Sequence, residues 1–299
     1  IREQAGGDPW DFGVLVVDNA PSDDQTRKLV GEFSDVRYAC EVKPGLNFAR
    51  NRAIREAGGD LIAYLDDDVT VDRGWLRGLH EAWSENPDAA AFTGQVLPRE
   101  LETAAQILFE QRGGFRRGFN KARYTASVPD HEVELYPCRT GIFGVGCNMA
   151  FRREVLLALG GFDEALDTGR PLAGGGDHDI FYRVIRAGYP LVYEPTYLVY
   201  HQHRRTMAQL RRQYWSWGQS VMAFATKAHA ADPPLRRRWR KLMMAWFATQ
   251  IRELTKAALG RHVLPARLLA WELWGGAVGW CGEYRRSRLR IQRICKEHQ

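Results

Sequence analysis

Short apolar runs alternate with longer amphipathic segments over residues 1–203. The apolar runs are rich in Val, Ile, Leu and Ala and end in polar residues or glycine, which is typical of strands buried on both faces. Such strands are expected at residues 13–19, 61–65, 89–97 and 191–203. Between them, apolar side chains at helical spacing predict helices at residues 23–33, 48–59 and 73–86. This alternation predicts an α/β fold with a mostly parallel, Rossmann-like sheet flanked by helices.

Two glycine-rich segments occupy the second half of this region. Residues 141–162 (GIFGVGCNMAFRREVLLALGGF) are a glycine-laced apolar stretch that leads into a helix ended by a glycine pair. Residues 173–190 (AGGGDHDIFYRVIRAGYP) open with flexible glycines and continue as a helix that begins near Asp177. Residues 100–136 show no pattern that places an element.

The pattern changes after His203. Apolar side chains now recur every third or fourth residue beside several arginines, at Met207, Leu210, Tyr214, Trp217, Val221 and Phe224. Two further basic amphipathic helices are expected at residues 235–260 and 264–290, the latter with a Trp-rich apolar middle. We therefore expect an α/β domain over residues 1–203 and a C-terminal helical basic extension over residues 204–299.

Composition limits the class of protein and its compartment. The 299 residues are 45% hydrophobic, enough to bury a core, without an apolar run long enough for a transmembrane span or the layout of a signal peptide. The five cysteines form no Cys-x-x-Cys pair, which indicates reduced thiols in a cytosolic protein. Residues 204–299 carry 20 Lys or Arg against 5 Asp or Glu, whereas the rest of the chain is acidic. We expect the tail to meet an anionic partner and the body to handle a cation or a polyhydroxylated substrate.

Three consecutive carboxylates, Asp66, Asp67 and Asp68, follow the apolar run LIAYL. Alternate residues at a strand end face the same side, so Asp66 and Asp68 can share one cleft at the sheet edge where ligands bind. Mg²⁺ or Mn²⁺ held by one or two carboxylates keeps positions open for phosphate oxygens. The alternative for the triplet taken alone is a solvated acidic turn.

Two more groups could carry chemistry. Asp177 follows three glycines and begins a helix, and Arg183 can pair with Asp179 one turn earlier. Asp177 is then the less committed carboxylate and a candidate general base, the alternative being that both aspartates only cap the helix. His201 and His203 follow a strand on the same side, where either could bind a metal or be structural.

These motifs occur in one order along the chain. VVDNAPSDD, GLNFARNRAI, GDLIAYLDDDV, NMAFRREVLLALGGFDEAL and GGGDHDIFYRVIRAGYPLVYEP precede the region of His201. Together they resemble the inverting glycosyltransferases of family 2, which have the GT-A fold, over roughly residues 10–205. The resemblance implies a hexosyltransferase-type enzyme that uses a nucleotide diphosphate sugar with Mg²⁺ or Mn²⁺, for example in making cell-envelope polysaccharide.

The resemblance also implies which residues bind the donor. Asp18 is similar to a residue that contacts the nucleotide base, and Arg50 to one that contacts the base or a phosphate. The acidic triplet resembles the family's Asp-x-Asp motif, which implies that Asp66 or Asp67 lies near the ribose.

For the metal and the proton transfer, the resemblance implies a second set. Asp68, with Asp66 beside it, resembles the carboxylate that binds the metal, and His201 the late metal ligand, with His203 as the alternate. Asp177 matches the position of the catalytic base, which would accept the proton of the acceptor hydroxyl so that the sugar inverts its configuration.

The chain departs from the family pattern in two places. Family members usually open with a strand and a helix ahead of the strand at 14–18, so this chain is expected to be truncated at its N-terminus. The residue before the base is often acidic and is Gly176 here.

The basic tail bears on partners and location. Arg-flanked helices with Trp, Phe and Met on the other face suit an anionic membrane, so we expect a peripheral protein at the cytoplasmic membrane face with a hydroxylated glycan or lipid-linked acceptor. The alternative is that the apolar stripes pack on the domain while the arginines are solvated. Nucleic acid is not expected as a partner, because no such module is evident. A sugar nucleotidyltransferase and a non-catalytic nucleotide-sugar-binding or membrane adaptor are the alternatives for function.

Overall fold

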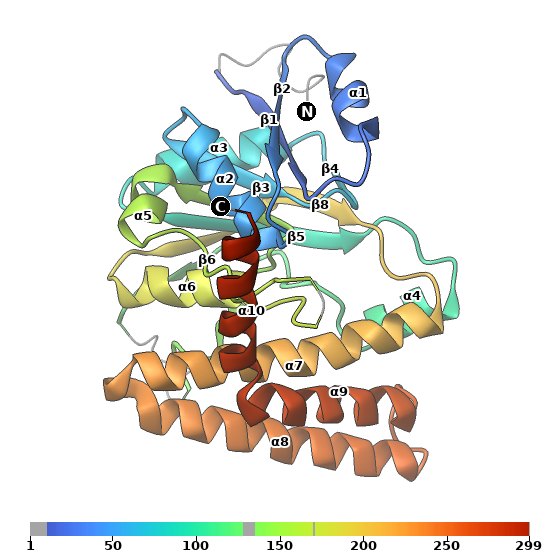
Figure 1. Ribbon diagram of the computed structural model, residues 1–299. Coiled ribbons are helices and arrows are strands. Elements are labelled where there is room, and N and C mark those ends of the chain that lie inside the picture. The colour runs from blue at the N-terminus through green and yellow to red at the C-terminus, as the bar shows by residue number, and fades with distance from the viewer. Residues whose placement is uncertain (1–10, 128–134, 170, 299) are drawn as a thin grey trace.

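A central β-sheet with helices on both sides forms the body of the protein in the computed structural model, which describes residues 11–127, 135–169 and 171–298 (Figure 1). Five of its six strands lie in the spatial order β3, β7, β5, β8 and β4, and β6 pairs with β8. Their bounds are β3 (Leu61–Leu65), β4 (Val69–Val71), β5 (Ala91–Pro98), β6 (Ala122–Tyr124), β7 (Asn148–Arg152) and β8 (Leu191–His201). The predicted α/β class is confirmed.

A smaller parallel pair, β1 (Val14–Asn19) and β2 (Val36–Glu41), begins the described chain. α1 (Gln25–Gly31) connects the two strands, and α2 (Leu46–Glu56) follows β2 and packs against both. Within the described residues, no backbone pairing joins this two-stranded sheet to the six-stranded one.

The direction of the strands differs from the prediction. In the six-stranded sheet β5 and β8 pair in parallel, whereas β7 runs antiparallel to β3 and β5, and β4 and β6 run antiparallel to β8. The sheet is therefore mixed rather than mostly parallel. Strands buried on both faces have the same apolar composition in either direction. Direction depends on where the chain crosses between strands, and the crossing segment 99–147 is the part in which the sequence predicted almost no element.

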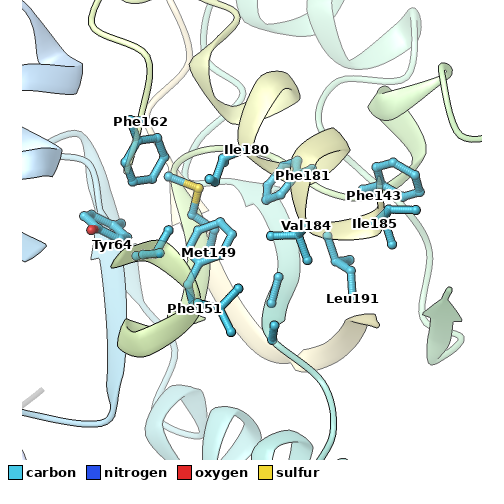
Figure 2. Close-up of a cluster of buried hydrophobic side chains, with 14 of the residues drawn as sticks. Tyr64, Phe143, Met149, Phe151, Phe162, Ile180, Phe181, Val184, Ile185 and Leu191 are labelled. Carbon is cyan, nitrogen blue, oxygen red and sulfur yellow. The ribbon is translucent and has the colours of Figure 1, made fainter. Parts of the chain in front are cut away.

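α6 (Gly176–Arg186) covers one face of the sheet through a stripe at helical spacing: Ile180, Phe181, Val184 and Ile185. Figure 2 shows these side chains directed at strand residues, and the Phe181 ring stacks on the Phe151 ring at 6.0 Å between centroids. α5 (Arg153–Ala158) packs in the same cluster. Fully burying one side chain of this size stabilises the fold by about 1.5–3 kcal/mol, so the cluster holds α6, and with it Asp177, firmly on the sheet.

α3 (Trp75–Glu85) covers the opposite face. Neighbouring strand residues show the alternation, since Ala91 and Phe151 pack with the α6 cluster whereas Phe92 packs with α3. A Cβ at Gly78 of α3 would stand 2.6 Å from backbone atoms of β8. Glycine at this position therefore allows the helix to lie directly on the strand.

The C-terminal helices form a layer along one side of the body (Figure 1). α7 (Met207–Ala231), α8 (Arg236–Ala258) and α9 (Ala266–Val278) pack on one another. Leu210 and Tyr214 of α7 are buried with residues of α4 (Ala104–Gln111) and α9, and Phe224 packs on Tyr182 of α6. The apolar stripe of α7 thus packs on the domain, which is one of the two alternatives for it.

The third predicted tail helix is broken in two. α9 ends in a kinked stretch (Gly279–Glu283), where Cys281 leaves helical geometry and Gly282 has a φ of 86°, and α10 (Tyr284–Glu297) follows. Glycine accepts this left-handed conformation without strain, so the helix turns at this point. Among the described residues, none of the helices has both the length and the hydropathy needed to cross a bilayer.

Candidate active site

A cavity of about 870 Å³ lies where the ends of β3 and β8, the start of α6 and the N-terminal half of α7 meet. Its lining includes five residues selected from the sequence: Arg50, Asp66, Asp68, Asp177 and His201. They come from distant positions in the chain, and folding brings them around one space. The cavity is large enough for a drug-sized or nucleotide-sized ligand.

The acidic triplet forms the turn between β3 and β4. Asp66 and Asp68 line the cavity, whereas Asp67 is exposed and is not part of its described lining. Arg50 Nη2 lies 3.9 Å from Asp66 Oδ1. Burial raises the pKa of Asp66, and the charges of Asp177 and Asp67 raise it further against the opposing charge of Arg50. Additional positive charge in the cavity would stabilise the ionised carboxylates.

Asp68 faces His201, with 3.4 Å between His201 Nε2 and Asp68 Oδ1. Arg204 Nη1 lies 3.6 Å from the other carboxylate oxygen. Burial, followed by the charge of Asp66, raises the pKa of Asp68. Asp68 Oδ1 is buried and receives no hydrogen bond from any described residue. An unsatisfied buried oxygen is costly, and a cation between Asp68 and His201 would satisfy it.

The side chains that could bind a metal here suit an ion that is also bound by a substrate. Within the part of the chain that the structure describes, no three His, Cys, Asp or Glu side chains are grouped so that they could hold a metal ion. Asp68 and His201 offer two ligands, with Asp66 in the same lining. Mg²⁺ is usually bound through one or two carboxylates plus substrate phosphates, so the residues fit such an ion better than a closed structural zinc site.

The two histidines are not equivalent. His201 ends β8 and lines the cavity, and burial, His203 and Arg204 lower the pKa of His201 to about 3. The ring is therefore neutral at physiological pH, as metal ligation requires. His203 lies behind it, with its Nδ1 3.0 Å from His201 Nδ1 and its Nε2 2.9 Å from Glu110 Oε1. Of the two, His201 is the one positioned to reach a ligand in the cavity.

Asp177 stands in the first turn of α6, where two backbone N–H groups bind its carboxylate. Gly146 donates to Oδ2 at 3.1 Å and His178 donates to Oδ1 at 2.8 Å. Burial raises the pKa of Asp177, but the charges of His178 and Arg50 and the two backbone donors outweigh burial and hold the pKa below its ordinary value. The carboxylate is ionised at neutral pH and can accept a proton.

Asp179 is committed to ion pairs, as expected. Arg183 Nε lies 2.8 Å from Asp179 Oδ2, and Lys227 Nζ of α7 lies 2.6 Å from Asp179 Oδ1. Asp179 therefore joins α6 to α7, and of the two aspartates only Asp177 lines the cavity.

Arg50 is almost fully buried behind Asp66 and is held by a carboxylate that sequence reasoning missed. Its Nη1 donates to Asn47 Oδ1 at 3.1 Å and to Asp167 Oδ2 at 3.4 Å. Asp167 Oδ2 also accepts from Gly176 N at 2.7 Å. Burial raises the pKa of Asp167 to about 6, against the opposing charge of Arg50. Asp167 thus links the position of Arg50 to the start of α6.

Asp18, like Asp67, is a predicted site residue that lies outside the described lining of this cavity. It accepts a hydrogen bond from the Tyr38 hydroxyl at 2.9 Å, between β1 and β2. The next residue, Asn19, lines a neighbouring cavity of about 560 Å³ that shares Leu46 and Asp167 with the larger one. Asp18 therefore stands beside the second space rather than in the first.

Two further features of the site escaped the sequence analysis. Glu110 of α4, in the segment without a clear pattern, binds His203. Helix α7 supplies one wall of the cavity through Gln213, Trp217 and their neighbours, although the sequence pattern predicts it as part of a separate tail. A signal for α4 was present, since Thr103 and Gln106 form a capping box at its start.

Two curated proteins with similar sequences are glycosyltransferases by name. A pre-mycofactocin glycosyltransferase of Mycobacterium tuberculosis is 27% identical over 223 residues, which cover 74% of this chain and 44% of that protein. A glucosyl-dolichyl phosphate glucuronosyltransferase of Haloferax volcanii is 28% identical over 168 residues, which cover 54% of this chain and 48% of that protein. The chain spans about half the length of these relatives.

A solved mannosyltransferase from Pyrobaculum calidifontis, in complex with GDP-Man and Mn²⁺, superposes with a TM-score of 0.58 at 20% identity. The match covers 90% of this chain and 77% of that one. At this identity the likeness shows the fold, and the expected GT-A architecture is confirmed.

The family itself is shown by sequence. The protein-family model described as glycosyl transferase family 2 matches residues 1–160, which is more than half of the chain. The matched residues include the acidic triplet and Arg50. The chain belongs to glycosyl transferase family 2.

Proposed function

We propose that this chain transfers a sugar from a nucleotide diphosphate sugar to an acceptor hydroxyl, with a divalent cation and with inversion at the sugar. The proposal depends on one observation: Arg50, Asp66, Asp68, His201 and an ionised Asp177 all line the same cavity. The names of the relatives and the GDP-Man and Mn²⁺ bound by the similar mannosyltransferase support it.

On the donor side, Asp68 and His201, which lie 3.4 Å apart, would hold Mg²⁺ or Mn²⁺, with Asp66 beside them. When bound, the ion supplies Lewis-acid stabilisation of the nucleotide diphosphate as its charge develops. Arg50, fixed by Asn47 and Asp167, adds a second positive group for the donor. Asp18 and Asp67 lie outside the described lining of this cavity, and the contacts expected of Asp18 with the nucleotide base and of Asp67 with the ribose stay predictions.

On the acceptor side, Asp177 is the general base. Its two backbone donors fix the carboxylate, and a Cβ at Gly146 would come within 3.0 Å of Asp177, so the loop fits closely against it. As the acceptor oxygen bonds to the anomeric carbon, the bond from that carbon to the diphosphate oxygen breaks and the hydroxyl proton passes to Asp177. Attack from the face opposite the leaving group inverts the configuration.

We place the protein at the cytoplasmic face of an anionic membrane and its acceptor among hydroxylated glycans or lipid-linked sugars. Large apolar side chains remain exposed on the C-terminal helices and their connections: Met244, Ile251, Leu259, Val263, Trp271, Trp274 and Trp280. They lie in the strongly basic part of the chain. Apolar and cationic side chains together favour an anionic lipid surface. The Haloferax volcanii relative, named for a dolichyl phosphate-linked glucosyl group, supports a lipid-linked acceptor.

The test is transfer from a panel of nucleotide sugars in the presence of Mn²⁺, with wild type and Asp177→Asn compared. Loss of a positioned general base costs about 10²–10⁴-fold in rate, so we expect at least a hundredfold fall in kcat while Mn²⁺ binding persists. Proton NMR of the product should show an anomeric configuration opposite to that of the donor.

Asp60→Asn is the matched control, since Asp60 is an exposed aspartate that precedes β3 outside the cavity. Its activity should equal that of the wild type. Wild-type activity in Asp177→Asn would refute the base, and retained configuration would refute inversion.

A further inference from the structure

The histidine that faces the acidic triplet is connected to a buried carboxylate through a second histidine. We propose that Glu110 and His203 are positioning residues that fix the tautomer of His201, so that its Nε2 presents a lone pair, and not a proton, to a divalent cation at Asp68. The inference rests on the metal-dependent function proposed above and adds to it Glu110 of α4 and His203, which follows β8.

The contacts form one continuous path. Glu110 Oε1 lies 2.9 Å from His203 Nε2, His203 Nδ1 lies 3.0 Å from His201 Nδ1, and His201 Nε2 lies 3.4 Å from Asp68 Oδ1. Glu110, His203 and His201 are all buried. In each contact, two nitrogen or oxygen atoms that can share one hydrogen face each other. The nitrogen that carries the proton in one ring therefore determines which nitrogen carries it in the next.

The direction of the path is set at Glu110. Arg116 Nε lies 3.0 Å from Glu110 Oε2, an ion pair that keeps the group an acceptor. His203 Nε2 must then donate, and in the neutral ring His203 Nδ1 is a lone pair. It accepts from His201 Nδ1–H, which leaves His201 Nε2 without a proton.

The result is two acceptors in contact, His201 Nε2 and Asp68 Oδ1. Asp68 Oδ1 is buried and has no hydrogen-bond partner among the described residues. Two facing lone pairs are unfavourable in the protein alone and favourable around a cation. In the opposite arrangement, His201 Nε2–H would donate to Asp68 and close the position to a metal.

The surrounding residues hold the path in place. The Phe109 ring packs edge-on against His203 at 4.6 Å, and the Phe115 ring packs edge-on against His201 at 5.1 Å between centroids. A Cβ at Gly114 would fall 1.9 Å from Glu110 Oε1, so a larger residue would displace the carboxylate. Outer partners of metal-bound histidines commonly orient the ring and fix its tautomer.

Glu110→Gln tests the path with almost no change in volume. Arg116 requires an acceptor, so the amide oxygen faces Arg116 and the amide NH₂ donates to His203 Nε2. Each imidazole then carries its proton on the other nitrogen: His203 on Nδ1, which donates to His201 Nδ1, and His201 on Nε2. We expect Mn²⁺ affinity to fall about 10–100-fold, the usual effect of losing such a partner. The EPR signal of free Mn²⁺ measures it, with Mn²⁺ alone and with added inorganic pyrophosphate.

Glu194→Gln is the matched control. Glu194 is buried on β8, pairs with Lys121 at 2.9 Å and is not part of the described lining of the cavity. It loses the same charge and one ion pair, so its Mn²⁺ affinity should stay within twofold of the wild type. Equal Mn²⁺ affinity in Glu110→Gln and wild type would overturn the inference.

Long-range ¹H–¹⁵N spectra of the metal-free wild type give a second readout that does not depend on the folding of Glu110→Gln. His201 should carry its proton on Nδ1 and His203 on Nε2, with His201 signals assigned by their loss in His201→Gln. A proton on His201 Nε2 would overturn the inference even if Mn²⁺ binds. A wild type with the expected tautomers that binds no Mn²⁺ in either condition would instead remove the metal from the proposed function, and this inference with it.

Discussion

The burial and ionisation of single residues in this site depend on the charges that surround them. Arg50 is buried and can stay there because Asp167 and Asp66 lie within ion-pair distance. Asp167 bears the larger cost, since burial raises the pKa of Asp167 to about 6 from an ordinary value of 3.8. The Arg50–Asp167 ion pair therefore holds the Arg50 guanidinium at the cavity rather than adding to the stability of the fold.

The raised pKa of Asp167 predicts a pH dependence of folding. A carboxyl whose pKa is higher in the native state than in the unfolded state contributes stability below the unfolded value, and that contribution is lost as pH rises through the native value. From about pH 4 to about pH 7, wild type should lose up to about 3 kcal/mol relative to Asp167→Asn. Urea denaturation of both proteins at each pH measures the difference.

Asp163→Asn provides the comparison. Burial raises the pKa of Asp163, but Lys227 and the Tyr284 hydroxyl outweigh burial and hold that pKa below its ordinary value. Its contribution is lost only at lower pH, so the difference between wild type and Asp163→Asn should stay flat above about pH 5. A flat difference for Asp167→Asn as well would show that Asp167 is ionised at no cost.

At the scale of elements, the crossing of α7 and α9 supports the cavity wall. A Cβ at Gly218 of α7 would stand 2.0 Å from Glu272 O, and one at Gly275 of α9 would stand 2.0 Å from Trp215 O. The two helix backbones therefore touch through glycines. Because Trp215 and Trp217 of α7 line the cavity, the crossing sets the position of that wall.

Gly275→Ala should destabilise the protein. The added methyl meets backbone that cannot move without separating the helices, and overpacking of this kind costs about 1–3 kcal/mol. Urea denaturation should show that loss in the free energy of unfolding. Gly31→Ala at the end of α1, where a Cβ would meet nothing within 4 Å, should change stability little. Equal stabilities for the two variants would mean that α9 shifts freely on α7.

The elements also show what could be predicted. The strands near 61–65 and 191–201 were predictable because each is a short apolar run bounded by polar residues. Their directions were not, because composition is the same either way. The break at Gly282 was not recognised, since the apolar spacing of α9 continues up to it. α4 carries a capping box that was overlooked.

For the whole molecule, the predictable part of the site is the part that forms local motifs. Asp66, Asp68, Asp177 and His201 each follow a recognisable strand end or glycine run. Other residues gain a role only through contacts between distant positions. Asp167 meets Arg50 across 117 residues, and Glu110 meets His203 across 93. Such contacts depend on the folded arrangement and leave no pattern in a single sequence.

The whole molecule has an acidic body and a basic C-terminal layer, and this asymmetry makes the membrane proposal testable. The apolar stripe of α7 packs on the domain, whereas Trp271 and Trp274 of α9 remain 42% and 60% exposed. Removing two large apolar side chains from lipid costs at least about 2 kcal/mol, or roughly 30-fold in affinity. Trp271→Ala/Trp274→Ala should therefore bind phosphatidylglycerol vesicles at least that much more weakly in a sedimentation assay.

Charge and apolar contact can be separated in the same assay. High salt should weaken wild-type binding, because lipid charge attracts Lys and Arg only within a Debye length, and phosphatidylcholine vesicles should bind weakly throughout. Leu29→Ala/Leu157→Ala removes two exposed apolar side chains from α1 and α5 instead, and should bind like wild type. If the tryptophan variant also binds like wild type, the exposed face of α9 does not meet lipid, and the arginines of this layer serve only as a solvated surface.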